Sequence, residues 1–346
     1  MDKGRVKESR RYLSLDYIGG IAMAKQLPYT RREAKAWAKK HVVDWYECPL
    51  TPMTKDYTFD EAGMRENLEA YIEMGEAGLV LGGFLAECWN VKLSDWKRYH
   101  EIMADANRGR LPLWTIILDP SVHQALEKMQ FVQELGYVGA EVINPVVQLR
   151  SDQEIYDYFK YMTDHSDLAI WLYRTPVSGK VLGFDLIQRL ADIDTIVGVK
   201  QGSGNHADSL KLRREVRSDF IVSDPLEDVW WDDLRHGGQV LWGGFTNIIY
   251  GKKREVLHTY TKLAREGKWE EAYRLWGSLE SVRDLMNKFF AEPLFRTASY
   301  ATPIGNIKAW YEAMGLKAGP MLPPVRNISP EEKEKIKGEL KKVGVI

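Results

Sequence analysis

The chain has 346 residues, and its 45% hydrophobic and 28% charged content is that of an ordinary globular protein. Lys and Arg total 48 while Asp and Glu total 49, so the net charge of -1 favours neither a nucleic-acid surface nor an acidic tail. The two cysteines, Cys48 and Cys88, make no disulfide framework, and no Cys/His cluster has zinc spacing. The apolar runs are no longer than strands, so no transmembrane helix is expected.

Residues 1–40 are predicted to form an N-terminal extension. They begin with the basic stretch MDKGRVKESRR, and the following YLSLDYIGGIAMA contains Asp16 and lacks the apolar core of a signal peptide. Together with the low cysteine content, this pattern predicts a cytoplasmic protein.

Short apolar runs alternate with longer amphipathic stretches through residues 41–266, which is typical of parallel β/α units. Eight runs are predicted as strands, at residues 41–45, 78–82, 113–118, 139–144, 168–173, 196–200, 220–223 and 239–243. Helical patterns follow them, for example at residues 60–74, 94–107, 121–135 and 153–165. Eight units close a (β/α)8 TIM barrel, and no GxGxxG motif follows the first strand to favour a doubly wound open sheet.

Residues 267–346 are predicted to form a C-terminal helical extension. The pattern indicates one helix at 268–290 and another at 303–314. The proline-rich tail LKAGPMLPPVRNISPEE is expected to be extended, with Ser329 and Pro330 as the cap and first residue of a last helix.

The ends of the fifth and sixth predicted strands carry candidate catalytic residues, because barrel active sites lie at the C-terminal ends of the strands. Lys200 closes an otherwise apolar strand. Burial there would lower its pKa from about 10.4 and free the amine to attack a carbonyl. Tyr173 ends the neighbouring strand, where its phenol could move protons. The alternatives are a lysine that points to solvent and a core tyrosine.

Five sequence blocks in order resemble the dihydrodipicolinate synthase and N-acetylneuraminate lyase family of Schiff-base barrels, over roughly residues 45–325. The blocks are CPLTPMTKDYTFDE, GGFLAECWNVKLSDWKRYHE, YRTP, GVKQGSG and GGQVLWGGFTN. They are similar to the family's TPF, GTTGE…L, YNxP, GxK and GG…N motifs. The resemblance implies that Lys200 forms the Schiff base and that Tyr173 relays protons.

The chain departs from this family at three places. Where the family has two hydroxyl residues in GTTGE, this chain has the segment Gly83, Phe84, Leu85. Val146 and Val147 replace a tyrosine pair that serves a relay between subunits in the family, so we expect each site to be chemically self-contained. Ser178 replaces the arginine that binds the second substrate in lysine biosynthesis. Dihydrodipicolinate synthase activity is therefore not expected.

One branch, the trans-o-hydroxybenzylidenepyruvate hydratase-aldolases, resembles the chain more closely. The matching features are Cys88 after Glu87, Trp242 on the eighth strand and the tail KAGPMLPP. The substrates of this branch are aryl-substituted pyruvates. The resemblance therefore implies an apolar mouth, unless these side chains only pack the barrel wall. Its predicted lining is Phe84, Leu85, Val146, Val147 and Trp242.

Four further residues complete the predicted substrate-binding set: Gly83, Asn144, Arg174 and Gly243. Arg174 is expected either to pair with a substrate carboxylate or to join a surface ion pair. Glu87 is expected to organise its loop.

Three functions remain open. The first is a lyase in which the Lys200 imine promotes carbon–carbon cleavage of a 2-oxo acid. The second is an imine-dependent dehydratase or deaminase, and the third is a barrel that binds a ligand without catalysis. The expected partner is a small 2-oxo acid or aldehyde, with no metal, no cofactor, no nucleic acid and no membrane. Because family members are mostly pairs of tight dimers, the resemblance implies a homotetramer.

Overall fold

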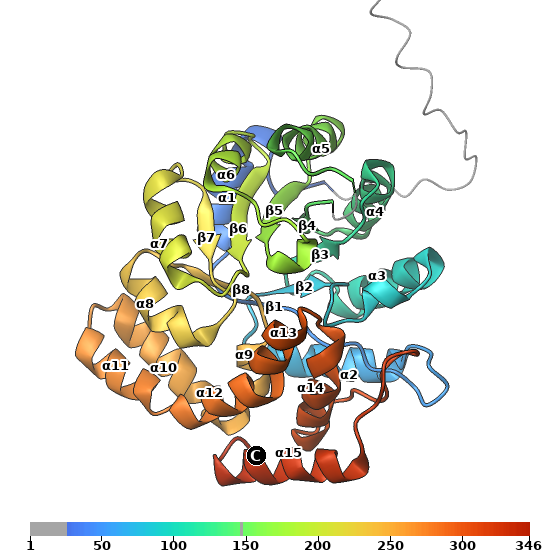
Figure 1. The fold of residues 1–346 in the computed structure, drawn as a ribbon, viewed down its shortest axis with the longest axis vertical. Coiled ribbons are helices and arrows are strands. Elements are labelled where there is room, and N and C mark those ends of the chain that lie inside the picture. The colour runs from blue at the N-terminus through green and yellow to red at the C-terminus, as the bar shows by residue number, and fades with distance from the viewer. Residues whose placement is uncertain (1–25, 146–147) are drawn as a thin grey trace, which may run out of the picture.

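The computed structural model describes residues 26–145 and 148–346. Eight parallel strands form one sheet in the order β7-β6-β5-β4-β3-β2-β1-β8, which curls into a nearly closed barrel (Figure 1). The strands are β1 (Asp44–Glu47), β2 (Gly78–Leu81), β3 (Leu113–Ile117), β4 (Gly139–Ile143), β5 (Ala169–Arg174), β6 (Ile196–Gln201), β7 (Ile221–Ser223) and β8 (Val240–Gly244). The fold is thus the (β/α)8 barrel expected from the sequence.

Helices alternate with the strands and form the outer layer of the barrel. They are α2 (Glu61–Glu73), α3 (Leu93–Asn107), α4 (Val122–Leu135), α5 (Asp152–His165), α6 (Phe184–Ala191), α7 (His206–Glu215), α8 (Trp230–Arg235), α9 (Thr246–Ile249) and α10 (Arg254–Arg265). Polar caps start several of them. In α5, Ser151 and Glu154 form a capping box, because each satisfies backbone N–H groups of the first turn. Each helix buries one face against the strands.

Helix α1 (Ala34–His41) lies across the N-terminal end of the barrel. Lys35 donates a hydrogen bond to the Ile193 carbonyl, just before β6, and the Tyr29 hydroxyl donates to the Val138 carbonyl, just before β4. The prediction that the first strand begins at His41 was wrong, because this residue ends α1 and the strand starts at Asp44. Part of the predicted N-terminal extension therefore closes the bottom of the barrel.

Aromatic side chains fill the barrel interior. The rings of Trp171 and Trp242 stack with centroids 4.0 Å apart, and Trp114 meets Trp242 edge-on at 4.8 Å. Trp242 also stacks on Tyr46 and is fully buried. The structure therefore places Trp242 inside the barrel and not at its mouth, where the sequence had suggested it. The bottom and middle of the barrel are a packed core, and the cavity beside Lys200 lies toward the strand ends.

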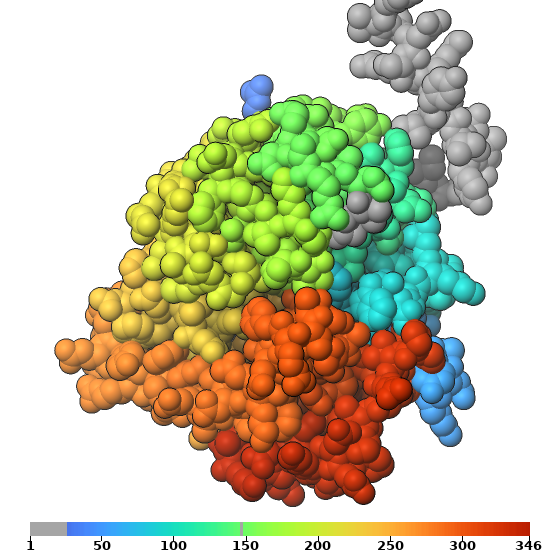
Figure 2. Space-filling model, in the orientation of Figure 1, coloured from blue at the N-terminus to red at the C-terminus, as the bar shows by residue number. Residues whose placement is uncertain are grey.

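The C-terminal helices gather on one side of the barrel, with α13 and the start of α14 near its centre in this view (Figure 1). The single helix predicted at residues 268–290 is instead split at Ser278 and Leu279, where the chain turns. The elements are α11 (Trp269–Gly277), α12 (Glu280–Met286), a π-helical turn η6 (Asn287–Ala291), α13 (Glu292–Thr297), α14 (Ala301–Ala313) and α15 (Pro330–Lys342). The predicted cap of the last helix is confirmed, since Ser329 and Glu332 form a capping box. Figure 2 shows these segments, in orange and red, covering part of the visible face.

The loop after β2 is fastened to the C-terminal segment. Glu87 is fully buried, accepts a hydrogen bond from the Leu322 amide and pairs with Lys308 at 2.6 Å. Asn90 donates to the Pro323 carbonyl. Glu87 therefore organises its loop by tying it to the tail. Within residues 26–145 and 148–346, no helix is long and apolar enough to cross a membrane.

Candidate active site

Lys200 lies near the C-terminal end of β6, between Tyr173 on β5 and Ser223 on β7 as its register partners. Its side chain is buried, and Nζ donates a hydrogen bond to the Gly243 carbonyl at 2.9 Å. Gly243 has a φ of 70°, and a Cβ there would lie 2.5 Å from Lys200 Nζ. A glycine at this position therefore leaves the room that the lysine amine occupies.

Glu141 on β4 provides a buried carboxylate beside the amine. Its Oε1 lies 3.8 Å from Lys200 Nζ, and its Oε2 accepts a hydrogen bond from Trp242 Nε1. Burial is the largest single effect and lowers the pKa of Lys200, but the Glu141 carboxylate together with Cys48 and Tyr300 outweighs it, so the net shift of this pKa is upward. The expectation of a lowered lysine pKa was therefore wrong. That expectation rested on desolvation of the lysine alone and left out the effect of a carboxylate inside the barrel.

Two phenols stand beside the lysine. Lys200 Nζ lies 4.4 Å from the centre of the Tyr173 ring. The Tyr173 hydroxyl is hydrogen-bonded to the hydroxyl of Tyr300, which caps α14. Burial raises the pKa of both phenols, so both stay protonated at neutral pH. The pair therefore offers a two-step path for a proton.

A cavity of about 760 Å³, including its open mouth, extends from Lys200 toward the C-terminal helices. Polar groups are few among its lining residues. Leu85 and Leu226 contribute apolar wall, and side chains from α12, η6 and α13 complete it, namely Met286, Phe290, Leu294 and Phe295. A mostly apolar cavity with a few convergent polar groups is typical of a small-molecule site.

The residues predicted for substrate binding are dispersed. Leu85 and Gly243 line the cavity together with Lys200. Phe84 stacks on Tyr300, with ring centroids 4.9 Å apart and planes within 5°. Gly83 packs against Ile116 of β3, because a Cβ on it would lie 2.3 Å from the Ile116 side chain. Val146 and Val147 lie outside the described residues.

The side chains of two other predicted residues form hydrogen bonds and ion pairs with groups of the protein itself. Arg174 is buried, donates to the Leu182 carbonyl and to Gln201, and forms an ion pair with Asp208 at 2.8 Å. Asn144 is buried and donates to the Lys180 carbonyl. Neither side chain is among those that line the cavity. Of the two alternatives for Arg174, the structure shows the protein ion pair.

Sequence reasoning missed Glu141, Tyr300 and His206, which contacts Asp224. Glu141 had a signal, because it is a lone acid within the apolar run GAEVI. Tyr300 had none, since it lies 127 residues from Tyr173 in sequence and reaches the site only through the path of the C-terminal helices.

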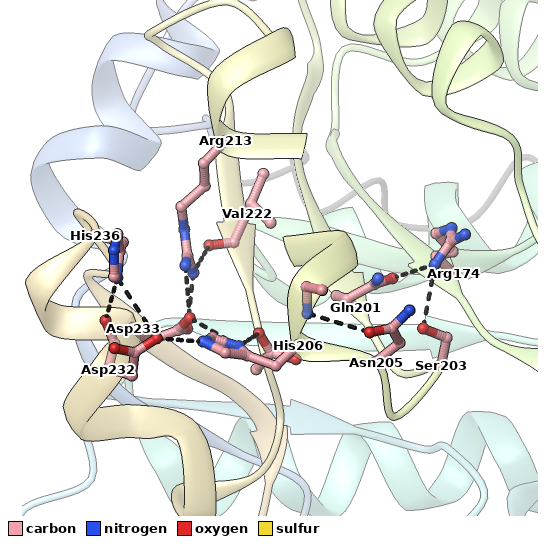
Figure 3. Close-up of polar contacts among 12 residues, drawn as sticks. Arg174, Gln201, Ser203, Asn205, His206, Arg213, Val222, Asp232, Asp233 and His236 are labelled. Carbon is pink, nitrogen blue, oxygen red and sulfur yellow. Dashed lines mark hydrogen bonds and ion pairs between the residues drawn. The ribbon is translucent and has the colours of Figure 1, made fainter. Parts of the chain in front are cut away.

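His206, Asp224 and Asp233 bring three possible metal-ligand atoms within 4.8 Å of one another. Protein cations already balance these groups. Arg213 holds both oxygens of Asp233, at 2.5 and 2.7 Å, and both ring nitrogens of His206 face carboxylates (Figure 3). This arrangement supports a charge network and gives no open set of ligands. That the protein needs no metal stays a prediction.

A (β/α)8 barrel with a buried lysine at the end of β6, a phenol beside it and a cavity that opens at the strand ends has the features of the class I lyases and aldolases, which form a Schiff base with a carbonyl substrate. The sequence model of the Dihydrodipicolinate synthetase family matches residues 44–343. The chain belongs to this family and is an enzyme of that class.

Curated relatives and solved structures cover most of the chain. The 4-hydroxy-tetrahydrodipicolinate synthase of Methanopyrus kandleri is 26% identical over 86% of this chain and 95% of the relative. The corresponding protein of Methanosarcina mazei is 25% identical over 86% of this chain and 97% of the relative.

Two solved structures share the fold. The dihydrodipicolinate synthase of Oceanobacillus iheyensis has a TM-score of 0.76 at 20% identity, covering 90% of this chain and 100% of that one. CdNal of Clostridium difficile, described in complex with mannosamine, also has a TM-score of 0.76, at 19% identity over 87% and 99% of the two chains.

Proposed function

We propose that this enzyme cleaves or forms a carbon–carbon bond of a 2-oxo acid that carries an apolar or aryl substituent, through a Schiff base on Lys200. The observation that carries the proposal is the position of the Lys200 amine. It borders a cavity with a mostly apolar wall, and the linked phenols of Tyr173 and Tyr300 stand beside it. The amine supplies the nucleophile, and the cavity wall offers surface for an apolar arm.

In the proposed reaction, neutral Lys200 attacks C2 of the 2-oxo acid and forms a carbinolamine. Tyr173 passes a proton to the departing hydroxyl, which leaves as water, and Tyr300 restores the proton on Tyr173. The resulting iminium accepts the electron pair of the C3–C4 bond when the aldol hydroxyl of the substrate gives its proton to the linked tyrosine pair, which restores the proton that the pair lost, and an aldehyde departs. Protonation of the enamine and hydrolysis of the imine then release pyruvate and free lysine. The Glu141 carboxylate balances the charge of the iminium.

The relatives named 4-hydroxy-tetrahydrodipicolinate synthase do not transfer their reaction to this chain directly. Ser178, which stands where that reaction needs an arginine, is buried, and its hydroxyl lies within hydrogen-bond distance of the carbonyls of Thr175 and Lys180, at 2.8 and 2.7 Å. With no hydroxyl side chain in Gly83, Phe84 and Leu85, we propose that backbone N–H groups of this loop hold the substrate carboxylate. The chain's resemblance to the hydratase-aldolases fits these departures better than the synthase reaction does.

An imine-dependent dehydratase or deaminase is the second candidate, because the same iminium would promote loss of water or ammonia. Product analysis separates the two reactions. Release of pyruvate and an aldehyde from an aldol substrate supports the lyase, whereas an unsaturated or deaminated product with the carbon chain intact supports the second candidate. A barrel that only binds ligand would show neither product and no borohydride-trapped imine.

Substrate preference tests the apolar arm. We expect kcat/KM for aryl-substituted 2-oxo acids to exceed that for 2-oxo acids with a second carboxylate, because burial of one aromatic ring contributes roughly 1.5–3 kcal/mol. A preference for the dicarboxylates would show that the proposed arm is wrong even if Lys200 forms the imine.

The homotetramer and the cytoplasmic location expected from the sequence remain proposals. Light scattering on the purified protein would test the homotetramer.

A further inference from the structure

The loop after β2 contacts helix α14 at two places. Near the start of the loop, Phe84 stacks on Tyr300, with ring centroids 4.9 Å apart and planes within 5°. Three residues later, Glu87 pairs with Lys308 at 2.6 Å. Tyr300 caps α14, and Lys308 lies eight residues further along the same helix. The two contacts are therefore about 12 Å apart along the helix axis, and together they define the position of α14 on the loop.

The ion pair at the second contact is buried. Glu87 is fully buried, and Lys308 is only 2% exposed. Lys308 also donates to the Pro320 carbonyl at 2.6 Å, and Glu87 accepts from the Leu322 amide at 2.8 Å. Burial lowers the pKa of Lys308, and the Glu87 carboxylate opposes this shift. Because a buried charge without its partner is costly, the pair resists any rotation or slide of α14 against the loop.

Glu87 has an unfavourable backbone conformation. Its φ of 57° lies in the left-handed region, which residues with a Cβ rarely adopt. Such a conformation persists only where the surrounding contacts fix it. Here the contacts to Lys308 and to the Leu322 amide fix it. The loop therefore depends on the C-terminal segment for its shape, and α14 depends on the loop for its position.

The position of α14 matters for the proton path because Tyr300 is the cap of this helix. The Tyr300 hydroxyl is hydrogen-bonded to the hydroxyl of Tyr173, which stands beside Lys200. Phe84 and Phe290 both pack against the Tyr300 ring, so the ring has little freedom to turn by itself. A displacement of the helix would therefore displace the hydroxyl. A shift of about 1 Å at a reacting group can cost about 10²-fold in rate.

We propose that Glu87 and Lys308 are positioning residues for the proton path. Their ion pair fixes α14 against the loop and thereby keeps the Tyr300 hydroxyl in contact with Tyr173. The inference rests on the proposed function, in which Tyr300 restores the proton on Tyr173. Neither Glu87 nor Lys308 is among the residues that line the cavity, so both act on the reaction through the groups that they hold.

The pair holds two groups, and the two affect different quantities. One is Tyr300, whose misplacement lowers the limiting rate of imine formation. The other is the backbone of the loop, which is proposed to bind the substrate carboxylate. A displaced loop would raise the substrate concentration that gives half the limiting rate. Measurement of both quantities therefore separates the proton path from substrate binding.

The experiment measures borohydride-trappable imine formation against substrate concentration, with whichever of pyruvate and phenylpyruvate the wild type traps faster. We expect Lys308→Met to lower the limiting rate by about tenfold, and by no more than Tyr300→Phe does, with a half-saturating concentration within about twofold of wild type. In a Tyr300→Phe background the same substitution should lower the rate by less than about twofold, because no second phenol is left to misplace. Lys308→Arg, which retains a cation for Glu87, should keep most of the wild-type rate.

A second variant covers the case in which Lys308→Met fails to fold because the Glu87 charge is left alone in the interior. Glu87→Gln combined with Lys308→Met removes both charges, and the glutamine still accepts from the Leu322 amide. It should show the same loss of limiting rate and the same lack of effect in the Tyr300→Phe background. Lys35→Met is the matched control, because Lys35 is also a buried lysine bonded to a backbone carbonyl but lies at the bottom of the barrel. It should leave the limiting rate within about twofold of wild type.

Three results would overturn the inference. The first is a loss of limiting rate that is equally large in the Tyr300→Phe background, which would mean a general effect on the fold. The second is an unchanged limiting rate, with or without a raised half-saturating concentration. The third is an equal loss in Lys35→Met. In each of these cases the imine on Lys200 is still trapped and the proposed function stands. If the wild type traps no 2-oxo acid, the proposed function itself fails, and the inference fails with it.

Discussion

The hydroxyl of Tyr173, at the end of β5, is hydrogen-bonded to the hydroxyl of Tyr300, which comes from the same chain 127 residues later. Tyr300 reaches this point because α12, η6 and α13 lead the chain back over the barrel mouth, and Phe84 stacks on its ring. The chain thereby provides two linked phenols, whereas Val146 and Val147, which replace the family's tyrosine pair, have no hydroxyl to offer. That each site is chemically self-contained stays a prediction.

Removal of either hydroxyl should slow imine formation. We expect Tyr173→Phe to lower the rate of borohydride-trappable imine formation by about 10²–10⁴, as for loss of a general acid–base group. Tyr300→Phe should cause a smaller loss, because Tyr300 acts through Tyr173. Stopped-flow or quenched trapping measures both rates, with Tyr311→Phe on the same helix as a control. A change below threefold in Tyr173→Phe would assign that residue to packing.

Glu141→Gln should move the pH profile of imine formation toward lower pH. The carboxylate raises the pKa of Lys200, so wild-type protein holds the amine as an ammonium ion up to higher pH. In the variant, only Cys48 and Tyr300 still oppose burial, so this pKa should fall and the acidic limb should move toward lower pH. The trapped fraction at saturation should also fall, because the iminium loses its counter-charge. Trapping with cyanoborohydride across pH measures both effects, and superimposable profiles would show that Glu141 does not act on the lysine.

The sequence predicted the barrel well because strand length and alternation are local signals. Its errors arise where the outcome depends on distant contacts. Arg174 ends a strand, as a substrate-binding residue would, but it forms an ion pair with Asp208 on a different element. Trp242 points into the barrel, where it packs against Trp171 and Trp114. How deep it lies depends on the packing of all the strands, which a local sequence pattern does not indicate.

Gly243→Ala should block the lysine without unfolding the barrel. The new methyl group would lie 2.5 Å from Lys200 Nζ in a backbone with φ of 70°. We expect imine trapping to fall by at least about 10², because a misplaced reacting group costs that much. Gly237→Ala separates strain from crowding, since Gly237 also has a positive φ but no atom within 4 Å of its Cβ position. It should lose about 1–2 kcal/mol of stability and keep trapping intact. Equal loss of trapping in both variants would contradict this explanation.

His206 should stabilise the protein in a pH-dependent way. Its folded pKa of about 9 lies above the ordinary value of 6.5, so its contribution is fully present below pH 6.5 and is lost as pH rises through 9. We expect the difference in Tm between wild type and His206→Gln to shrink across this window. Calorimetry at several pH values measures the difference. His165→Gln serves as a control, because His165 contacts the Tyr161 carbonyl and not a carboxylate. A difference in Tm that is constant from pH 6 to 10 would mean that His206 is neutral in the folded state.

The most direct test of the Schiff-base mechanism is peptide mapping of protein that has been incubated with a reactive 2-oxo acid and then reduced with borohydride. We predict that the added mass lies on the peptide containing Lys200 and that Lys200→Arg, which keeps a cation beside Glu141, gains no mass. Lys308 is the informative internal comparison, because it too is buried beside a carboxylate, that of Glu87, but does not line the cavity. An adduct on Lys308 or another lysine, retained in Lys200→Arg, would show that Lys200 is not the nucleophile.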